Sequence, residues 1–293
     1  MTRRPHKLLT DPAVRQEFAE QGFVLLPSYF TVAEAAGILD LATELILAPA
    51  VEFDEQGRAQ YDDDADPGSD VLPIRVNEAG NTDQVCRIED LLAASPSLAG
   101  FVRAFVTPAI SQLAGAEFVP FKDKLNFKHP GGGAFTPHQD YPAYSQFPPR
   151  YHITAMITLD AATADNGCLL FPRNYLATLE AAAANRVIAV DPIQLRTGRV
   201  VLPYDGNGDI DPVIIDLLDW DHVSTTPLDL VLFDSFVPHQ SFVNTSNRSR
   251  RAMFFTHNAA HEGQHGQAYY QLKRSDPNNV MFHWAVPSTV RRA

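Results

Sequence analysis

Hydrophobic and polar positions at the start of the chain alternate between helical and extended spacing. Between residues 11 and 22 apolar residues recur at helical spacing, with Asp11 as a cap before Pro12 and Gly22 at the end. Such boundaries are typical of a helix. The short apolar run at residues 23–26 then predicts a buried strand.

A second helix is predicted from Thr31, because Glu34 follows it at the spacing of a capping box. This helix is expected to run to about residue 48. Residues 52–68 hold a run of aspartates and end in Pro-Gly, which predicts a solvated loop. A calcium loop is the alternative, but the Gly and Glu spacing of an EF-hand is missing. Helical spacing returns between residues 88 and 113.

After about residue 118 the pattern changes to short β-rich runs separated by Pro, Gly and Asn. These runs are residues 151–159, 167–171, 228–233 and 251–256. Many short strands after a helical beginning predict a mainly β protein with flanking helices, a jelly roll or double-stranded β-helix.

We expect one domain over residues 1–293, since elaborated β enzymes reach this length as a single unit. Its expected parts are a mostly helical lead-in at 1–117, a jelly-roll core at 118–256, and a C-terminal cover at 257–293. A helix is predicted at 174–189, and residues 206–221 are polar and punctuated by Gly, as in an insertion.

Composition narrows the class of protein further. The 293 residues are 45% hydrophobic and 20% charged, which excludes disorder, and the net charge of −12 opposes binding to nucleic acid. The two cysteines and the lack of a signal-like apolar run favour a cytoplasmic setting. The apolar stretch at 41–51 is too short for a membrane span. We therefore expect a small-molecule substrate, no nucleic acid and no membrane, and leave the oligomeric state open.

Three local patterns carry candidate chemistry. His138 and Asp140 are two residues apart, so on an extended strand both side chains can reach one metal ion. His239 follows a buried-looking strand, and Arg250 and Arg251 lead directly into another. Alone, each histidine pattern is more typical of a structural histidine than of a metal site. Basic residues at the start of a strand are usually solvated, although the apolar continuation of this strand weakens that interpretation for Arg250 and Arg251.

Together the three patterns point to one chemistry. Two histidines and one carboxylate on one face of an octahedral metal leave three positions open, which is the arrangement of non-haem Fe(II) oxygenases. Two open positions can chelate a 2-oxoacid and the third can receive O₂. A guanidinium can then bind the distal carboxylate of the 2-oxoacid through two hydrogen bonds.

In these residues the sequence resembles the phytanoyl-CoA dioxygenase family of Fe(II)- and 2-oxoglutarate-dependent oxygenases. The triplet at 138–140 is similar to the His-Gln-Asp motif of the family, and residues 166–169 match its Asn-Gly-Cys-Leu hairpin. The stretch 239–251 has the spacing of the distal motif, in which an Arg follows the His by eleven residues. The resemblance extends from about residue 14 to residue 256.

The resemblance implies roles for particular residues. His138, Asp140 and His239 would bind Fe(II). Arg250 would hold 2-oxoglutarate, with Arg251 as the nearest competitor. Gln139 and Ser241 match positions that touch the cosubstrate. The implied reaction consumes O₂ and 2-oxoglutarate, gives succinate and CO₂, and oxidises a substrate C–H bond. Because related halogenases lack the carboxylate at the position of Asp140, hydroxylation, desaturation or ring formation is favoured over halogenation.

The substrate is less constrained by the sequence. We expect the lining to come from Tyr141, Tyr144, Phe147, Arg75 and Asn77. Lys124 and Asn126 could donate to the C1 carboxylate of the cosubstrate or to an anionic substrate. Residues 124–154 resemble the bacterial organophosphonate-oxidising branch, which favours a small zwitterionic or anionic substrate. A natural-product intermediate is the alternative.

Two other classes of protein remain open at this stage. A zinc hydrolase or lyase could use the same His/Asp/His ligands, but it would give no role to Arg250 and would need a general-base glutamate. A non-catalytic jelly-roll binding module is the second alternative.

Overall fold

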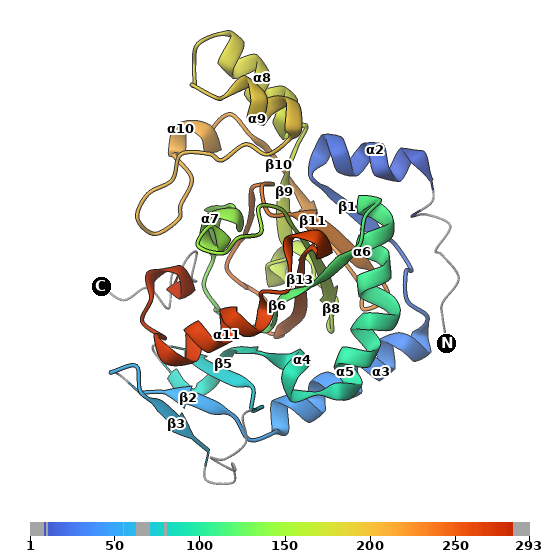
Figure 1. Cartoon of the computed structure of the whole chain (residues 1–293), viewed down its shortest axis with the longest axis vertical. Coiled ribbons are helices and arrows are strands. Elements are labelled where there is room, and N and C mark those ends of the chain that lie inside the picture. The colour runs from blue at the N-terminus through green and yellow to red at the C-terminus, as the bar shows by residue number, and fades with distance from the viewer. Residues whose placement is uncertain (1–8, 10, 55, 63–70, 79–80, 284–293) are drawn as a thin grey trace.

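Two β-sheets packed face to face form the centre of the molecule, and helices cover the outer side of the larger sheet (Figure 1). The computed structural model describes residue 9 and residues 11–54, 56–62, 71–78 and 81–283. Within these residues the larger sheet has nine strands in the order β1-β11-β8-β13-β6-β5-β4-β2-β3, and the smaller has four in the order β10-β9-β12-β7. The prediction of a jelly roll with flanking helices is confirmed.

The strands of the larger sheet are β1 Phe23–Leu26, β2 Val51–Phe53, β3 Ala59–Tyr61, β4 Ile74–Glu78, β5 Asn81–Glu89, β6 Phe118–Lys128, β8 His152–Thr158, β11 Leu230–Asp234 and β13 Arg250–Ala259. Those of the smaller sheet are β7 Phe135–His138, β9 Leu169–Arg173, β10 Asp219–Val223 and β12 His239–Ser241.

The α-helices are α2 Pro12–Gln21, α3 Val32–Leu47, α4 Leu91–Ala94, α5 Pro96–Phe101, α6 Thr107–Ala114, α7 Tyr141–Tyr144, α8 Tyr175–Ala184, α9 Pro192–Thr197, α10 Pro212–Ile215 and α11 Gly266–Ser275. Shorter turns are the π-helical η1 Val102–Val106 and the 3₁₀ turns η2 Ala164–Asn166, η3 Ala260–Glu262 and η4 Val280–His283.

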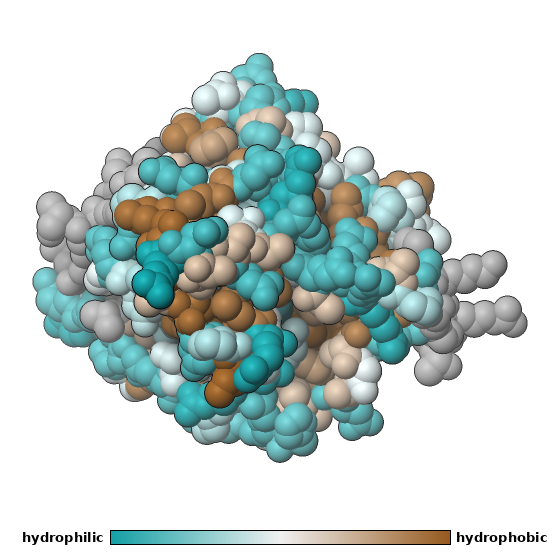
Figure 2. All heavy atoms as spheres, turned by 90° about the horizontal axis from the view of Figure 1, so that it is seen from above, coloured by the Kyte–Doolittle hydropathy of each residue, from teal (hydrophilic) through white to brown (hydrophobic). Residues whose placement is uncertain are grey.

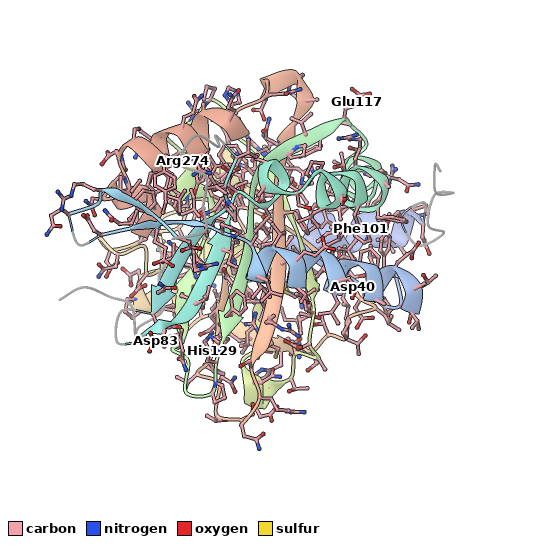
Figure 3. All side chains as sticks on the ribbon, turned by 90° about the horizontal axis from the view of Figure 1, so that it is seen from below. Asp40, Asp83, Phe101, Glu117, His129 and Arg274 are labelled. Atoms are coloured by element: carbon pink, nitrogen blue, oxygen red, sulfur yellow. The ribbon has the colours of Figure 1, made fainter. Side chains whose placement is uncertain are left out.

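The central strand β8 shows why this arrangement forms. All seven of its residues are buried, because side chains that alternate along the strand enter two different cores. Ile153 and Ile157 face the helices, while Met156 packs between the two sheets. On the helical side α3, which carries Asp40, and α5, which ends at Phe101, lie together, and α11 with Arg274 covers another part of the molecule (Figure 3).

Boundary residues of the first helices act as the sequence indicates. Asp11 caps α2 through the main-chain N–H of Ala13, and the capping box of Thr31 and Glu34 starts α3. Gly22 ends α2 with φ +72°, and a Cβ there would lie 2.8 Å from Cβ of Val237. The close approach requires glycine and brings the N-terminal helix against the turn before β12.

The lead-in at 1–117 is less helical than predicted. It supplies β1 to β5 to the large sheet, and residue 88 lies in β5 rather than in a helix. The predicted loop at 52–68 includes parts of β2 and β3, while the aspartates at 63, 64 and 66 lie outside the described residues. Residue 88 lies in a strand because β5 pairs with β6. A local sequence pattern does not contain the information about such pairing between distant segments.

Other boundaries differ by a few residues. The helix predicted at 174–189 ends at Ala184, β13 continues to Ala259, and residues 219–221 of the expected insertion begin β10. The end of the molecule that carries α8 to α10 shows hydrophobic residues interspersed with hydrophilic ones (Figure 2). Its exposed apolar side chains include Val187, Ile193 and Val213. In the described part of the chain, no helix has the length and apolar character needed to cross a membrane.

Candidate metal centre and its pocket

His138, Asp140 and His239 converge at the edge of the smaller sheet. Each offers one ligand atom, and these atoms lie within 4.8 Å of one another. His138 ends β7 and His239 begins β12, and the two residues are direct partners across this antiparallel pair, with ring centroids 4.3 Å apart. Asp140 follows His138 by two residues at the entrance to α7. We call these three residues the triad.

Hydrogen bonds of the two rings leave the opposite nitrogens available to a metal. Nδ1 of His138 lies 2.7 Å from the carbonyl oxygen of Thr136, and Nδ1 of His239 lies 3.2 Å from that of Val237. If each Nδ1–H donates to its carbonyl, each Nε2 keeps a lone pair, as in many metal sites.

Charge states of the triad also suit a cation. Burial lowers the pKa of His138 to about 3 and lowers that of His239. Burial opposes ionisation of Asp140, but His239 and Lys124 outweigh it and lower the pKa of this carboxyl. Two neutral imidazoles and a carboxylate are the forms that bind a divalent metal. Among the described residues, the triad is the one cluster of three or more potential metal-binding side chains.

Gln139, between two triad residues, faces the protein and braces the site. Its Nε2 donates to the carbonyl oxygens of Val200, at 2.7 Å, and Phe236, and its Oε1 accepts from the N–H of Leu202 at 2.8 Å. The side chain is 2% exposed. The structure therefore places Gln139 as a link between the 200–202 segment and the turn before His239, whereas the sequence predicted a contact with the cosubstrate.

Arg250 forms a second polar centre. It begins β13, is 3% exposed, and donates from Nη2 to the carbonyl oxygen of Gly167 at 2.6 Å. Its Nε is buried without a partner, and burial lowers the pKa of the guanidinium to about 10. Within the described residues Arg250 makes no ion pair. An orphaned donor on a buried cation fits a carboxylate from a ligand.

Lys128 lies opposite Arg250 in the register of β6 and β13 and is also 3% exposed. Its Nζ donates to Oγ of Ser241 at 2.7 Å and to the carbonyl oxygen of Phe242 at 2.6 Å. Burial, and then the charge of Arg250, lower the pKa of Lys128 to about 7. The sequence left open whether Lys128 donates to a bound anion or faces the surface, because a local pattern does not show which side of its strand will be buried.

Arg251, the competitor of Arg250, points elsewhere. It is bound to Asp160 by Nε at 2.9 Å and by Nη2 at 2.7 Å, and both side chains are partly exposed. Because Asp160 already neutralises the charge of Arg251, Arg250 is the better candidate to bind a ligand.

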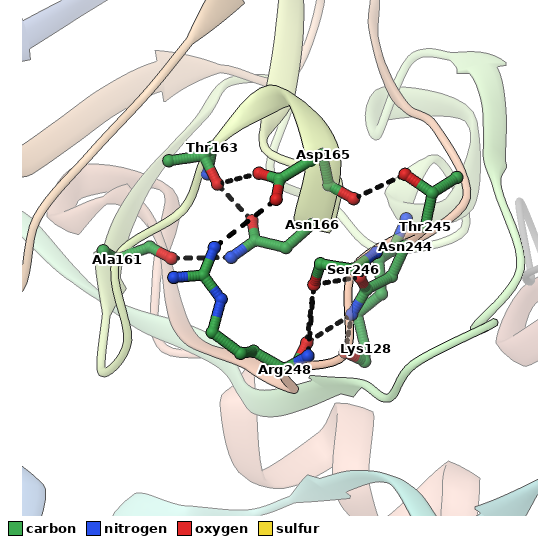
Figure 4. Close-up of polar contacts among 9 residues, drawn as sticks. All are labelled: Lys128, Ala161, Thr163, Asp165, Asn166, Asn244, Thr245, Ser246 and Arg248. Carbon is green, nitrogen blue, oxygen red and sulfur yellow. Dashed lines mark hydrogen bonds and ion pairs between the residues drawn. The ribbon is translucent and has the colours of Figure 1, made fainter.

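The turns at residues 161–166 and 244–248 are held by a network of side-chain hydrogen bonds (Figure 4). Asn166 closes the 161–166 turn by accepting from the N–H of Thr163 and donating to the carbonyl oxygen of Ala161. Asn244 donates to the carbonyl oxygens of Lys128 and Arg248. Two asparagines of the sequence motifs thus fix the strand ends from which Lys128 and Arg250 extend.

A cavity of about 50 Å³ adjoins the triad, and we call it the triad pocket. The wall of this pocket includes the charged residues Arg87, Glu89, Lys122, Lys124 and Asp140, together with His138. The predicted Asn126 and Tyr144 also line it, as do Met281 and Phe282 near the C-terminal end of the described chain.

Several expected lining residues lie outside this wall. Arg75 is paired with Asp62, and Asn77 donates to Glu52, on the β2 side of the sheet. Tyr141 stacks on Phe236, with ring centroids 4.4 Å apart. The side chain of Phe147 belongs to the apolar cluster behind the pocket.

Arg87 and Glu89 are functional candidates that the sequence did not reveal. They alternate along β5 with buried Ile88, a pattern that would have marked an inward-facing strand had the segment not been predicted as helix. Burial lowers the pKa of Lys124 to about 8, and Lys122 adds to this effect. The wall of the pocket holds three basic side chains, Arg87, Lys122 and Lys124, against two acidic ones, Glu89 and Asp140.

A jelly roll that brings two histidines and a carboxylate together, and that buries Arg250 without an ion pair among the described residues, fits an Fe(II)- and 2-oxoglutarate-dependent oxygenase. The family model described as phytanoyl-CoA dioxygenase (PhyH) matches residues 18–173. The chain belongs to this family. Of the classes that the sequence left open, relatives named as a dioxygenase and a hydroxylase support the oxygenase rather than a zinc hydrolase or a binding module.

Two curated relatives cover most of the chain. It is 32% identical to a 2-aminoethylphosphonate dioxygenase of an uncultured bacterium, over 89% of this chain and 86% of the relative. It is also 32% identical to a methylphosphonate hydroxylase of Gimesia maris, over 91% of this chain and 87% of the relative.

Solved structures share the fold at lower identity. EctD from S. alaskensis, crystallised with 2-oxoglutarate and 5-hydroxyectoine, is 19% identical with a TM-score of 0.65, covering 89% of this chain and 80% of that one. The carbocyclase SnoK of nogalamycin biosynthesis is 16% identical with a TM-score of 0.59, covering 88% of each chain.

Proposed function

We propose that this oxygenase hydroxylates a C–H bond of a small organophosphonate. The observation that carries the proposal is the concentration of basic side chains in the triad pocket. Arg87, Lys122 and Lys124 line the same cavity as His138 and Asp140. A phosphonate group offers three oxygens and up to two negative charges, which ammonium and guanidinium groups bind strongly. Both curated relatives are named for phosphonates.

In this proposal His138, Asp140 and His239 hold Fe(II), and Arg250 binds the distal carboxylate of 2-oxoglutarate. Ser241 Oγ accepts from Lys128, so its own proton remains available to the same carboxylate. Bound together, iron and 2-oxoglutarate supply the O₂ activation that oxidises a C–H bond, with release of succinate and CO₂. The carboxylate of Asp140 favours hydroxylation over halogenation.

The remaining residues orient the substrate and exclude water. Lys124, on β6 of the larger sheet, lines the same pocket as His138 and Asp140, and its ammonium is 5.1 Å from the ring centroid of Phe254. Asn126, two residues along the same face of β6, can add a neutral donor. Met281 and Phe282, from the turn η4 near the end of the described chain, also line the pocket. Together these groups would hold a phosphonate so that its carbon chain faces the iron.

The test is substrate-triggered O₂ uptake and succinate formation by the Fe(II)-loaded enzyme with a panel of small phosphonates. Lys124→Met should raise the KM for the phosphonate roughly tenfold or more, because it removes a charged donor. Arg103→Met removes an exposed positive charge outside the site and serves as the control. Activity that persists without O₂ and 2-oxoglutarate, or an unchanged KM in Lys124→Met, would contradict the proposal.

A further inference from the structure

We infer that the triad pocket is built for an anionic substrate without an ammonium group, because lysines of the chain itself occupy the places where a substrate ammonium would bind. The inference rests on the proposed phosphonate chemistry and goes beyond it, since amine-free and amine-bearing phosphonates would otherwise suit the same oxygenase equally well.

Glu89 is the first group of the pocket that could bind a substrate ammonium. The described residues that line the pocket include two carboxylates, Glu89 and the triad member Asp140. Glu89 is 1% exposed, and both of its oxygens are already paired. Oε1 lies 2.5 Å from Nε of Arg87, and Oε2 accepts from Nζ of Lys273 at 2.7 Å. A substrate ammonium would have to displace one of these buried cations.

Aromatic rings are the second kind of group that could bind a substrate ammonium, because their faces attract cations. Nζ of Lys122 lies 5.6 Å from the ring centroid of Tyr144 and 5.2 Å from that of Tyr269. Nζ of Lys273 lies 5.2 Å from the ring centroid of Phe282. These rings already have a cation of the chain within cation–π distance.

The charge of the pocket reinforces this exclusion. Burial lowers the pKa of Lys273 to about 7 and lowers that of Lys122, so these cations are already held at a cost in desolvation. A further ammonium would be desolvated beside like charges and without an acceptor of its own. An uncharged alkyl group of the same size meets no such penalty, and the anionic end of either molecule gains the same contacts.

Two isosteric pairs of phosphonates test the inference, because replacing a terminal methyl by an ammonium changes charge with little change in size. The pairs are ethylphosphonate with aminomethylphosphonate, and propylphosphonate with 2-aminoethylphosphonate. Titration calorimetry of the anaerobic Fe(II)- and 2-oxoglutarate-loaded enzyme gives each Kd without turnover. We expect the alkyl member of each pair to bind at least about tenfold more tightly. Equal or tighter binding of the amine would overturn the inference.

A variant of Lys273 tests the cause of the discrimination. Lys273→Met leaves Oε2 of Glu89 without its lysine, so the preference for the alkyl compound should shrink several-fold. Lys273→Arg keeps a cation there and should retain the preference. If Lys273→Met folds, as judged by its circular dichroism, and discriminates like the unmodified protein, the assigned role of Lys273 is wrong. If it does not fold, the isosteric pairs decide alone.

Turnover separates this inference from the proposed function. Alkylphosphonates that bind more tightly than amines but trigger no succinate would uphold the inference and refute phosphonate oxidation. Aminophosphonates that bind more tightly than alkylphosphonates and are oxidised would refute the inference and uphold phosphonate oxidation. Absence of binding by all four compounds would refute both.

Discussion

Arg250 and Lys128 are direct partners across the antiparallel strands β13 and β6, and both side chains are buried. Like charges opposite each other destabilise a sheet, and burial adds a desolvation penalty for each. The described residues provide neither with an acidic partner. A carboxylate bound between the two cations would offset both penalties, which is why the proposed function assigns this pair to the cosubstrate.

The first prediction concerns Lys128. Lys128→Met should raise the KM for 2-oxoglutarate roughly tenfold, because it removes one charged donor from the carboxylate site. The stability of the free protein should change little, since relief of the like-charge contact with Arg250 offsets the loss of the hydrogen bonds to Ser241 and Phe242. Initial rates at varied 2-oxoglutarate and a urea titration measure the two effects. Lower stability with an unchanged KM would mean that Lys128 is structural.

A second prediction is the pH dependence of cosubstrate binding. In the free enzyme Lys128 loses its proton as the pH rises through about 7, and a bound carboxylate would raise this pKa. Binding therefore takes up a proton above about pH 7, and the Kd for 2-oxoglutarate should rise there by up to about tenfold per pH unit. Anaerobic titrations across this range check the slope, which should be absent in Lys128→Met.

The two neighbouring arginines give a third, matched prediction. Arg250→Lys should weaken 2-oxoglutarate binding by roughly 10- to 100-fold, because an ammonium cannot reproduce the two-pronged hydrogen bond of a guanidinium. Arg251→Lys should leave this binding unchanged, since Arg251 is engaged by Asp160. Binding constants for 2-oxoglutarate are the measurement. Reversal of the two effects would show that Arg251 is the true ligand-binding residue.

Fourth, the triad can be tested by metal content. His138→Ala and Asp140→Ala should each lose bound Fe(II) after anaerobic reconstitution and lose 2-oxoglutarate turnover, while circular dichroism stays native. His222→Ala removes an exposed histidine outside the triad and is the control. Succinate formation at the unmodified rate in either triad variant would refute the ligand assignment.

The fifth prediction uses two glycines of opposite behaviour. A Cβ on Gly167, which has φ +79°, would lie 2.7 Å from Cδ of Lys128, so Gly167→Ala should cost about 1–3 kcal/mol of unfolding free energy. A Cβ on Gly37, within α3, meets nothing within 4 Å, so Gly37→Ala should stabilise by about 0.5–1 kcal/mol. Chemical denaturation measures both. Equal effects would contradict the close packing around Lys128.

The sequence was informative wherever one short segment determines the result. Asp11 and Gly22 bound a helix by local hydrogen bonding and a left-handed turn. The spacing of His138 and Asp140 indicated one shared site, whereas the resemblance to the family added His239, and the structure brings the three side chains together. The prediction of a mainly β fold followed from many short strands with turn residues between them.

What the sequence did not reveal depends on contacts between distant segments. Glu89 lay in the segment predicted as helical and Arg87 directly before it, although pairing with β6 makes both part of a strand whose inner face reaches the pocket. Lys273 enters the same cluster from 184 residues further along the chain. Gln139 matched a motif position, but only the fold shows that its amide is consumed by main-chain groups.

The register of β7 and β12 has a consequence for how such enzymes can diverge. Since adjacent strands set the distance between the imidazoles of His138 and His239, the chain that joins them can lengthen or shorten without moving either ring. The segment that carries α8 to α10 lies in this connection. Additions there can reshape the outer surface over evolutionary time without displacing the two imidazoles, whereas a slip of one residue between the paired strands would turn an imidazole to the opposite side.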